Sequence, residues 1–264
     1  MKKTTYLLLP LILFVFQMSY SQEITGIATY KSFAKLDLKM DSTQVSAEMR
    51  DQIKQMIKQH TQKEYDLYFN KNEMLFKEKE KLAAPGNKMF ENASVSSFGG
   101  IGVMYQNLKE NLEIHQTEIL GKMFLVSDTL QKHEWTLEKE TKNIGEYVCF
   151  KATRTSVLEN KETGENRENV ITAWYTPQIP VAGGPSGHGG LPGLILEVQS
   201  GDVTFLCNQI ILNPKNGVNI AAPKKGQMVS KEEFEAIKEK KLMEMQEQTS
   251  FPSNSKTIEI RVGG

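Results

Sequence analysis

Hydrophobic and polar residues alternate along most of the chain, in short runs separated by turn-forming residues. The first run is 24–33 (ITGIATYKSF), and the next two, EYDLYFN and EMLFKEKE, flank the hairpin signature Lys71-Asn72. Further runs of this kind follow at 102–108, 112–120, 123–130, 135–140, 146–157, 169–175, 194–200 and 202–212. Short strands joined by tight turns predict a mainly β (α+β) fold with a single curved antiparallel meander, as an open sheet or a half-barrel.

Two stretches have the three- and four-residue spacing of helices instead. Residues 43–60 repeat apolar side chains at this spacing, which predicts an amphipathic helix packed on the sheet. A second helix is predicted at 230–248, where Ser230 and Glu233 form a capping box. The apolar contacts expected of this second helix are Phe234, Ile237, Leu242 and Met245. Residues 257–262 have the pattern of an edge strand, and residues 83–102 that of a long loop.

The most unusual segment lies at 183–193, where eight of eleven residues are Gly or Pro. Three interpretations compete. A phosphate-binding loop would need a Gly-Lys-Ser/Thr ending that leads into a helix, and here a strand follows. A catalytic or metal-binding loop would centre on His188, but the other histidines have no ligand spacing to it. A structural crossover or ligand-gating loop is favoured, with Trp174 and Tyr175 lining a groove or capping the core.

The first 22 residues have the three parts of a secretory signal peptide. Lys2 and Lys3 precede an apolar run of about ten residues, and Ser19-Tyr20-Ser21 provides small residues for cleavage near Ser21. That run is well short of the roughly 20 residues that span a bilayer. We therefore expect 1–21 to be cleaved, 22–264 to form one domain without a transmembrane segment, and the protein to be exported to the periplasm, the outer membrane or the medium.

Charge and cysteine content argue against two further kinds of function, nucleic-acid binding and structural zinc binding. The chain has 264 residues with 32 basic and 32 acidic side chains, and cleavage would leave a net charge of −2, which argues against a nucleic-acid partner. An exported chain meets an oxidising compartment, so Cys149 and Cys207 could form a disulfide, or could be two buried thiols. Two cysteines without a CxxC pattern make no structural zinc site, and we expect no metal and no cofactor.

The loop also carries a family resemblance. The string 190–195 (GLPGLI) resembles the motif for which the GLPGLI family is named. Matching segments elsewhere are 125–128, 135–137, 140–144, 147–152, 173–176, 179–180, 184–185, 213–215, 223–226 and 233–234. The resemblance covers roughly 24–247. It implies an exported protein of Bacteroidota with no established activity, and its arrangement of sheet and helix is similar to lipoprotein-carrier half-barrels.

These observations lead to one expectation about function and two alternatives. The expectation is a non-enzymatic envelope protein that binds an apolar ligand or a partner protein in a groove. The residues assigned to the motif loop and groove are Trp174, Tyr175, Pro180, Gly184, Pro185, His188, Gly190, Leu191, Pro192, Gly193, Leu194 and Ile195. The first alternative is an extracytoplasmic hydrolase that uses His188, with no other catalytic residue assigned. The second is an accessory component of an outer-membrane receptor or transport system.

Overall fold

The computed structural model describes residues 24–34, 62–79, 102–159 and 166–248. The predicted signal peptide, the helix at 43–60, most of the loop at 83–102 and the strand at 257–262 lie outside these ranges. No helix in the described ranges is long and apolar enough to cross a membrane.

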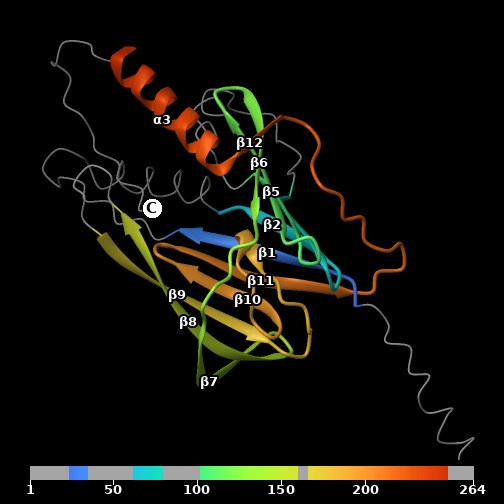
Figure 1. Ribbon diagram of the computed structural model, residues 1–264. Coiled ribbons are helices and arrows are strands. Elements are labelled where there is room, and N and C mark those ends of the chain that lie inside the picture. Colours follow the sequence, from blue (N-terminus) through green and yellow to red (C-terminus); the bar gives the residue numbers. More distant parts are fainter. Residues whose placement is uncertain (1–23, 35–61, 80–101, 160–165, 249–264) are drawn as a thin grey trace, which may run out of the picture.

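Within the described ranges the fold is one open sheet with a helix at one edge, which confirms the mainly β prediction (Figure 1). The strands are β1 (Gly26–Ala34), β2 (Glu64–Phe69), β3 (Glu73–Glu78), β4 (Val103–Asn107), β5 (Leu112–Ile119), β6 (Lys122–Thr129), β7 (Thr136–Ile144), β8 (Tyr147–Glu159), β9 (Asn166–Thr176), β10 (Leu194–Ser200), β11 (Val203–Leu212) and β12 (Gln227–Ser230). The 3₁₀ turn η3 (Pro185–Gly187) precedes β10, and the helix α3 (Lys231–Gln248) follows β12.

The sheet is built from two antiparallel meanders on either side of β1. Its strand order is β12-β6-β5-β4-β3-β2-β1-β11-β10-β9-β8-β7. The first meander is β2–β6 and the second is β7–β11, and β1 pairs with a strand of each. In Figure 1, β1 (blue) lies between β2 (cyan) and β11 (orange). The only parallel pair in this sheet is β12 with β6. The sheet therefore contains two meanders and one parallel edge strand, and not the single antiparallel meander that the sequence predicted.

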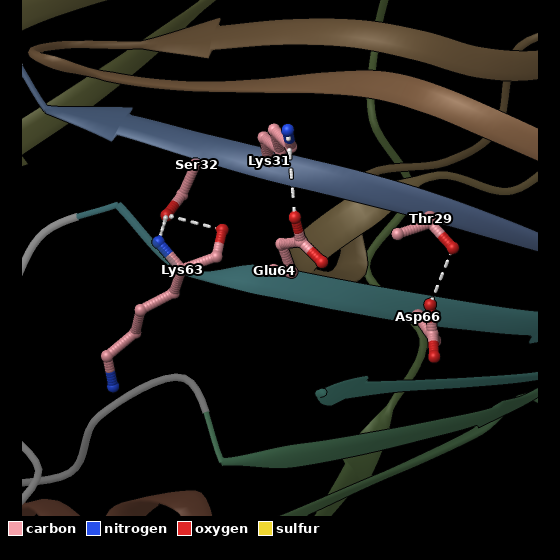
Figure 2. A network of polar contacts seen from close by, with 6 residues as sticks. All are labelled: Thr29, Lys31, Ser32, Lys63, Glu64 and Asp66. Atoms are coloured by element: carbon pink, nitrogen blue, oxygen red, sulfur yellow. Dashed lines mark hydrogen bonds and ion pairs between the residues drawn. The ribbon is translucent and has the colours of Figure 1, made fainter. Parts of the chain in front are cut away.

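Polar side chains tie β1 to β2 along their shared edge (Figure 2). The buried Thr29 hydroxyl donates to Asp66 at 2.7 Å. The Ser32 Oγ accepts from the backbone amide of Lys63 at 3.1 Å, and its hydroxyl donates to the Lys63 carbonyl at 3.4 Å. These bonds satisfy polar groups that would otherwise be buried without partners, and they fix the register of the central strand.

The main core draws side chains from both meanders. Aromatic rings from β1, β2, β3 and β11 meet there: Tyr65 stacks on Phe76 at 5.1 Å, and Phe205 contacts both edge-on. Such pairs add to the free energy of burial. Tyr30 donates its hydroxyl proton to the Ile195 carbonyl at 2.7 Å, which links the central strand to β10.

A smaller core lies under α3. The predicted capping box is confirmed: the Ser230 hydroxyl accepts from the Glu233 amide, and the Glu233 carboxylate accepts from the Ser230 amide. Phe234 packs against Phe124, and Ile237 joins the same cluster. The prediction for Leu242 was wrong, since this side chain is 41% exposed. Met245, one turn further along the helix, is partly buried.

Candidate functional site

The Gly/Pro segment joins β9 to β10 and folds back on itself between them. Its backbone bonds are local: the Gly190 amide donates to Ala182, and the Ile195 amide donates to Gly183, at 3.1 and 2.9 Å. A Cβ at Gly183 would overlap Met74 of β3, so the first meander packs directly on this backbone. Because β9 and β10 are adjacent antiparallel strands, residues 177–193 form a long hairpin connection rather than a true crossover between separated strands. This connection, called the crossover below, is held tightly against both halves of the sheet.

Apolar side chains of this crossover form part of the main core. Ile179, Val181 and Leu191 are each at most 1% exposed and belong to the main core cluster. The space inside the curved sheet around the crossover is thus filled by the crossover itself. The free energy gained by burying these side chains offsets the conformational entropy lost on ordering a segment so rich in glycine.

The sequence-assigned residues divide by exposure. The buried ones are Tyr175, Gly184, Pro185, Leu191, Gly193, Leu194 and Ile195. Pro180, Gly190 and Pro192 are exposed, and Trp174 and His188 are partly exposed. Successive residues of a strand point to opposite faces, so Trp174 and Tyr175 diverge. Trp174 lies under the Lys142 ammonium at 4.4 Å, away from the contacts of His188.

Around His188 the structure assembles four side chains from three segments. The Arg154 guanidinium of β8 contacts the His188 Nδ1 at 3.3 Å and lies over the ring of Trp135 at 5.3 Å. The rings of His133 and His188 are 6.3 Å apart. Trp135 donates its indole proton to the Gly189 carbonyl at 2.9 Å, which fixes the crossover relative to the start of β7.

The electrostatics of this cluster disfavour protonated histidine. Burial, followed by the nearby Arg154 and His133, lowers the pKa of His188 to about 4. Burial and Arg154 also lower the pKa of His133, although a hydrogen bond to the Gly187 backbone opposes this. Because arginine can only donate, the Nδ1 of His188 must be its unprotonated nitrogen. His188 is thus a neutral ring with its proton on Nε2.

The cluster lacks the parts of a hydrolytic site. The side-chain partner of the His188 ring is Arg154, and in the described residues neither an acid nor a Ser or Cys nucleophile bonds to it. A histidine whose pKa is about 4 is a weak base at neutral pH. The described residues also contain no group of three metal-ligating side chains.

Sequence reasoning missed Arg154 and His133. A signal existed for Arg154: it shares a strand face with Ala152, which is fully buried, so alternation places a charge at an inward position. His133 has no comparable signal, because it precedes β7 in a stretch without periodicity. Its approach to His188 depends on the tertiary path of the crossover.

A second candidate site is a groove of about 620 Å³ beyond the opposite end of β7. The β7–β8 hairpin forms one side of this groove, and β10 and β11 form the other. Its lining residues are Lys142, Asn143, Ile144, Gly145, Glu146, Tyr147, Leu196, Glu197, Leu206, Cys207, Asn208, Gln209 and Ile210.

Two irregularities in strand pairing coincide with this groove. The register of β10 against β9 skips Leu196, and the register of β11 against β1 skips Asn208. Each is an extra residue of the β-bulge type, which bends a strand and increases its twist. Both extra residues line the groove, so the hollow lies where the sheet departs from regular pairing.

Cys149 and Cys207 are both free, buried thiols in the structure. Burial raises the pKa of Cys149 to about 11 and that of Cys207 to about 12. Thiols with such pKa values carry almost no thiolate at neutral pH, and thiolate is the reactive form. Their present role is to pack as small apolar side chains.

Comparisons with known proteins give a limited result. No curated protein matches the chain. A solved structure described as PNGF-II in a C2 space group is 18% identical, with a TM-score of 0.48 over 83% of this chain and 33% of that chain. PNGF-II in a P21 space group is 20% identical, with a TM-score of 0.44 over 78% of this chain and 31% of that one. The chain thus spans about a third of the length of these proteins.

One family model also matches, at residues 135–170 and 159–197, and it is described as "Protein of unknown function (Porph_ging)". The match begins at Trp135, includes Arg154 and the crossover, and ends at Glu197. From β7 to β10, the chain is therefore similar to an uncharacterised family whose function is unknown.

Proposed function

We propose that the chain is an exported cell-envelope protein of the GLPGLI type that binds a small ligand without transforming it. The groove between the β7–β8 hairpin and β10–β11 carries this proposal, because its volume of about 620 Å³ falls in the range of ligand sites. Export rests on the basic, apolar and small-residue parts of the first 22 residues.

The groove chemistry favours an amphipathic ligand over a purely apolar one. Ile144, Tyr147 and Ile210 offer partly exposed apolar surface packed against the main core. Lys142 and Glu197 add a charged pair, with Nζ and Oε2 2.7 Å apart. A ligand with an apolar body and one polar end would bury its body on the first set and meet the pair with its polar end.

Neither alternative has an observation of its own in support. Hydrolysis at His188 would need an acid or nucleophile partner, and the ring instead faces Arg154. A role as accessory component of an outer-membrane system would need a surface matched to a partner, and the groove is a concave site of small-molecule size. A free binding protein is the function that the geometry supports best.

The test uses N-phenyl-1-naphthylamine, a neutral amphipathic dye that fluoresces in apolar sites. We expect saturable binding at one site per chain. Asn208→Trp should weaken binding by about tenfold or more, because the larger side chain fills the hollow at the bulge. Asn219→Trp is the matched control, since it changes an exposed Asn outside the groove and should leave binding unchanged. No saturable binding, or equal effects of the two variants, would reject the groove as the site.

A further inference from the structure

The cluster around His188 contains one positive charge, the Arg154 guanidinium, without a counter-ion. Arg154 forms no ion pair with any carboxylate in the described residues, and burial alone accounts for its lowered pKa. Two lysines of the second meander do have acidic partners: Lys142 pairs with Glu197, and Lys151 pairs with Glu138 and Glu140. Arg154 is partly buried and has no such partner, which is costly for a charge that has lost part of its solvent.

The guanidinium has two neighbours within the cluster. Its Cζ lies 5.3 Å from the centre of the Trp135 ring, which is itself fixed by its bond to Gly189. One terminal nitrogen is directed at His188, while the Nε is buried and has no acceptor. A native structure pairs nearly all such donors, so an orphaned guanidinium N–H indicates a missing acceptor.

His188 adds a donor at the same place. With Nδ1 facing Arg154, the Nε2 of His188 carries a proton that it can donate. The His133 ring is 6.3 Å from the His188 ring, and its own hydrogen bond is to the Gly187 backbone. His133, Trp135, Arg154 and His188 are all partly exposed, so a solute can reach them from outside.

The nearest acid on the facing elements has another role. Glu113 of β5 accepts from Gln106 at 2.6 Å, and the same Gln106 nitrogen donates to the Gly187 carbonyl at 3.3 Å. Glu113 thus helps to anchor η3 to the first meander through Gln106, and its carboxylate lies next to Gly187, where a Cβ would be 3.6 Å from Oε2. The charged and titratable groups that face His188 are Arg154 and His133.

We propose that Arg154 and His188, next to His133, form a binding site for an oxyanion, the carboxylate or phosphate group of a small solute. The planar fork of arginine matches the two oxygens of such a group, and the Nε2 proton of His188 adds a further donor. A cation would be repelled by Arg154, and the nitrogen of His188 that faces Arg154 cannot also ligate a metal. This site shares no residue with the groove, so it goes beyond the proposed function.

Binding is measured on the full chain by NMR of the histidine rings. Phosphate and acetate are titrated at constant ionic strength, with chloride as the replaced anion. We expect saturable shifts at His188 and His133 and an increase of the His188 pKa above about 4, because the anion stabilises the protonated ring. Tighter binding of phosphate or of acetate identifies which group the site prefers. Shifts that rise linearly and equally with every anion would overturn the proposal.

Two variants on the same strand separate a specific site from general charge. Arg154→Met and Lys151→Met each remove one positive charge from β8. We expect Arg154→Met to weaken anion binding by about tenfold or more and Lys151→Met to leave it unchanged. Equal effects would overturn the site. Arg154→Lys keeps the charge and loses the fork, so it covers a failure of Arg154→Met to fold, and unchanged affinity in this variant would also overturn the site.

Discussion

The two meanders that flank β1 are built from similar strands, but the connections that lie in the described residues differ between them. In the first meander, three connections are tight turns, at residues 70–72, 108–111 and 120–121. In the second, the turns at 145–146 and 201–202 are equally tight, whereas β9 and β10 are joined by residues 177–193. That crossover places apolar side chains in the core and contacts β3 and β4 of the first meander.

The difference shows that a connection can have the packing role of a strand. In the first meander the interior is formed by alternate residues of the strands, as in Leu67 and Phe69 of β2. In the second, Ile179 and Leu191 of the crossover are buried as deeply as these. Stability of the sheet should therefore depend on the crossover as strongly as on its strands, and three experiments test this.

The largest effect is expected from a methyl group at Gly193. A Cβ there would meet the carbonyl of Thr176 and the nitrogen of Pro177, which are backbone atoms and cannot move aside. Gly193→Ala should lower the free energy of unfolding in urea by about 3 kcal/mol or more. Gly121→Ala, in a turn of the first meander with open space around it, should cost about 1 kcal/mol from its positive φ. Equal losses of unfolding free energy in the two variants would show that the crossover is no more tightly packed than a turn of the first meander.

The next effect concerns a side chain of the crossover. Leu191→Ala should lower the free energy of unfolding by about 3 kcal/mol, as much as Leu67→Ala on β2, because both side chains are at most 1% exposed. Leu120→Ala is the exposed control and should change the free energy by less than about 0.5 kcal/mol. Urea titration measures all three. A small loss in Leu191→Ala would mean that the crossover rests on the core without contributing to it.

The smallest effect is a pH dependence that originates in the crossover. The pKa of His188 is lowered from 6.5 to about 4, so between these values the unfolded chain binds a proton that the folded chain does not. Stability is thus complete above about pH 6.5 and falls as the pH drops towards 4. The shift corresponds to about 3 kcal/mol, and solvent screening of the partly exposed ring reduces the expected loss to about 2 kcal/mol. His188→Gln, which still accepts from Arg154, should flatten this part of the pH profile in urea titrations. An unchanged profile would place the acid sensitivity elsewhere.

The sequence predicted local structure well where one segment contains the whole signal. Alternation located β1–β6 and β8–β11 to within a few residues, and Ser230 with Glu233 specified the start of α3. It did not find β12, because four residues are too short for a period. It also did not place β1 at the centre of the sheet, because nothing in Gly26–Ala34 identifies a partner at Val203–Leu212.

The residues that form the candidate sites were also only partly predictable from the sequence. The Gly/Pro composition singled out the crossover and His188, but the neighbours of His188 come from before β7 and from β8. The groove depends on the extra residues Leu196 and Asn208, which arise from pairing between strands. Both sites are products of contacts between distant segments, and a single sequence does not encode such contacts as a local pattern.

The central position of β1 has a kinetic consequence for the growing chain. One side of β1 gains its partner as soon as β2 has emerged, whereas the other waits for β11, and the amide of Thr25 binds Asn213 across 188 positions. Closing so long a loop carries the entropy cost that slows folding of sheets with high contact order. Until residue 212 emerges, the middle of the final sheet is an open edge, and the β1 amides that bind β11 should gain protection from hydrogen exchange later than those that bind β2.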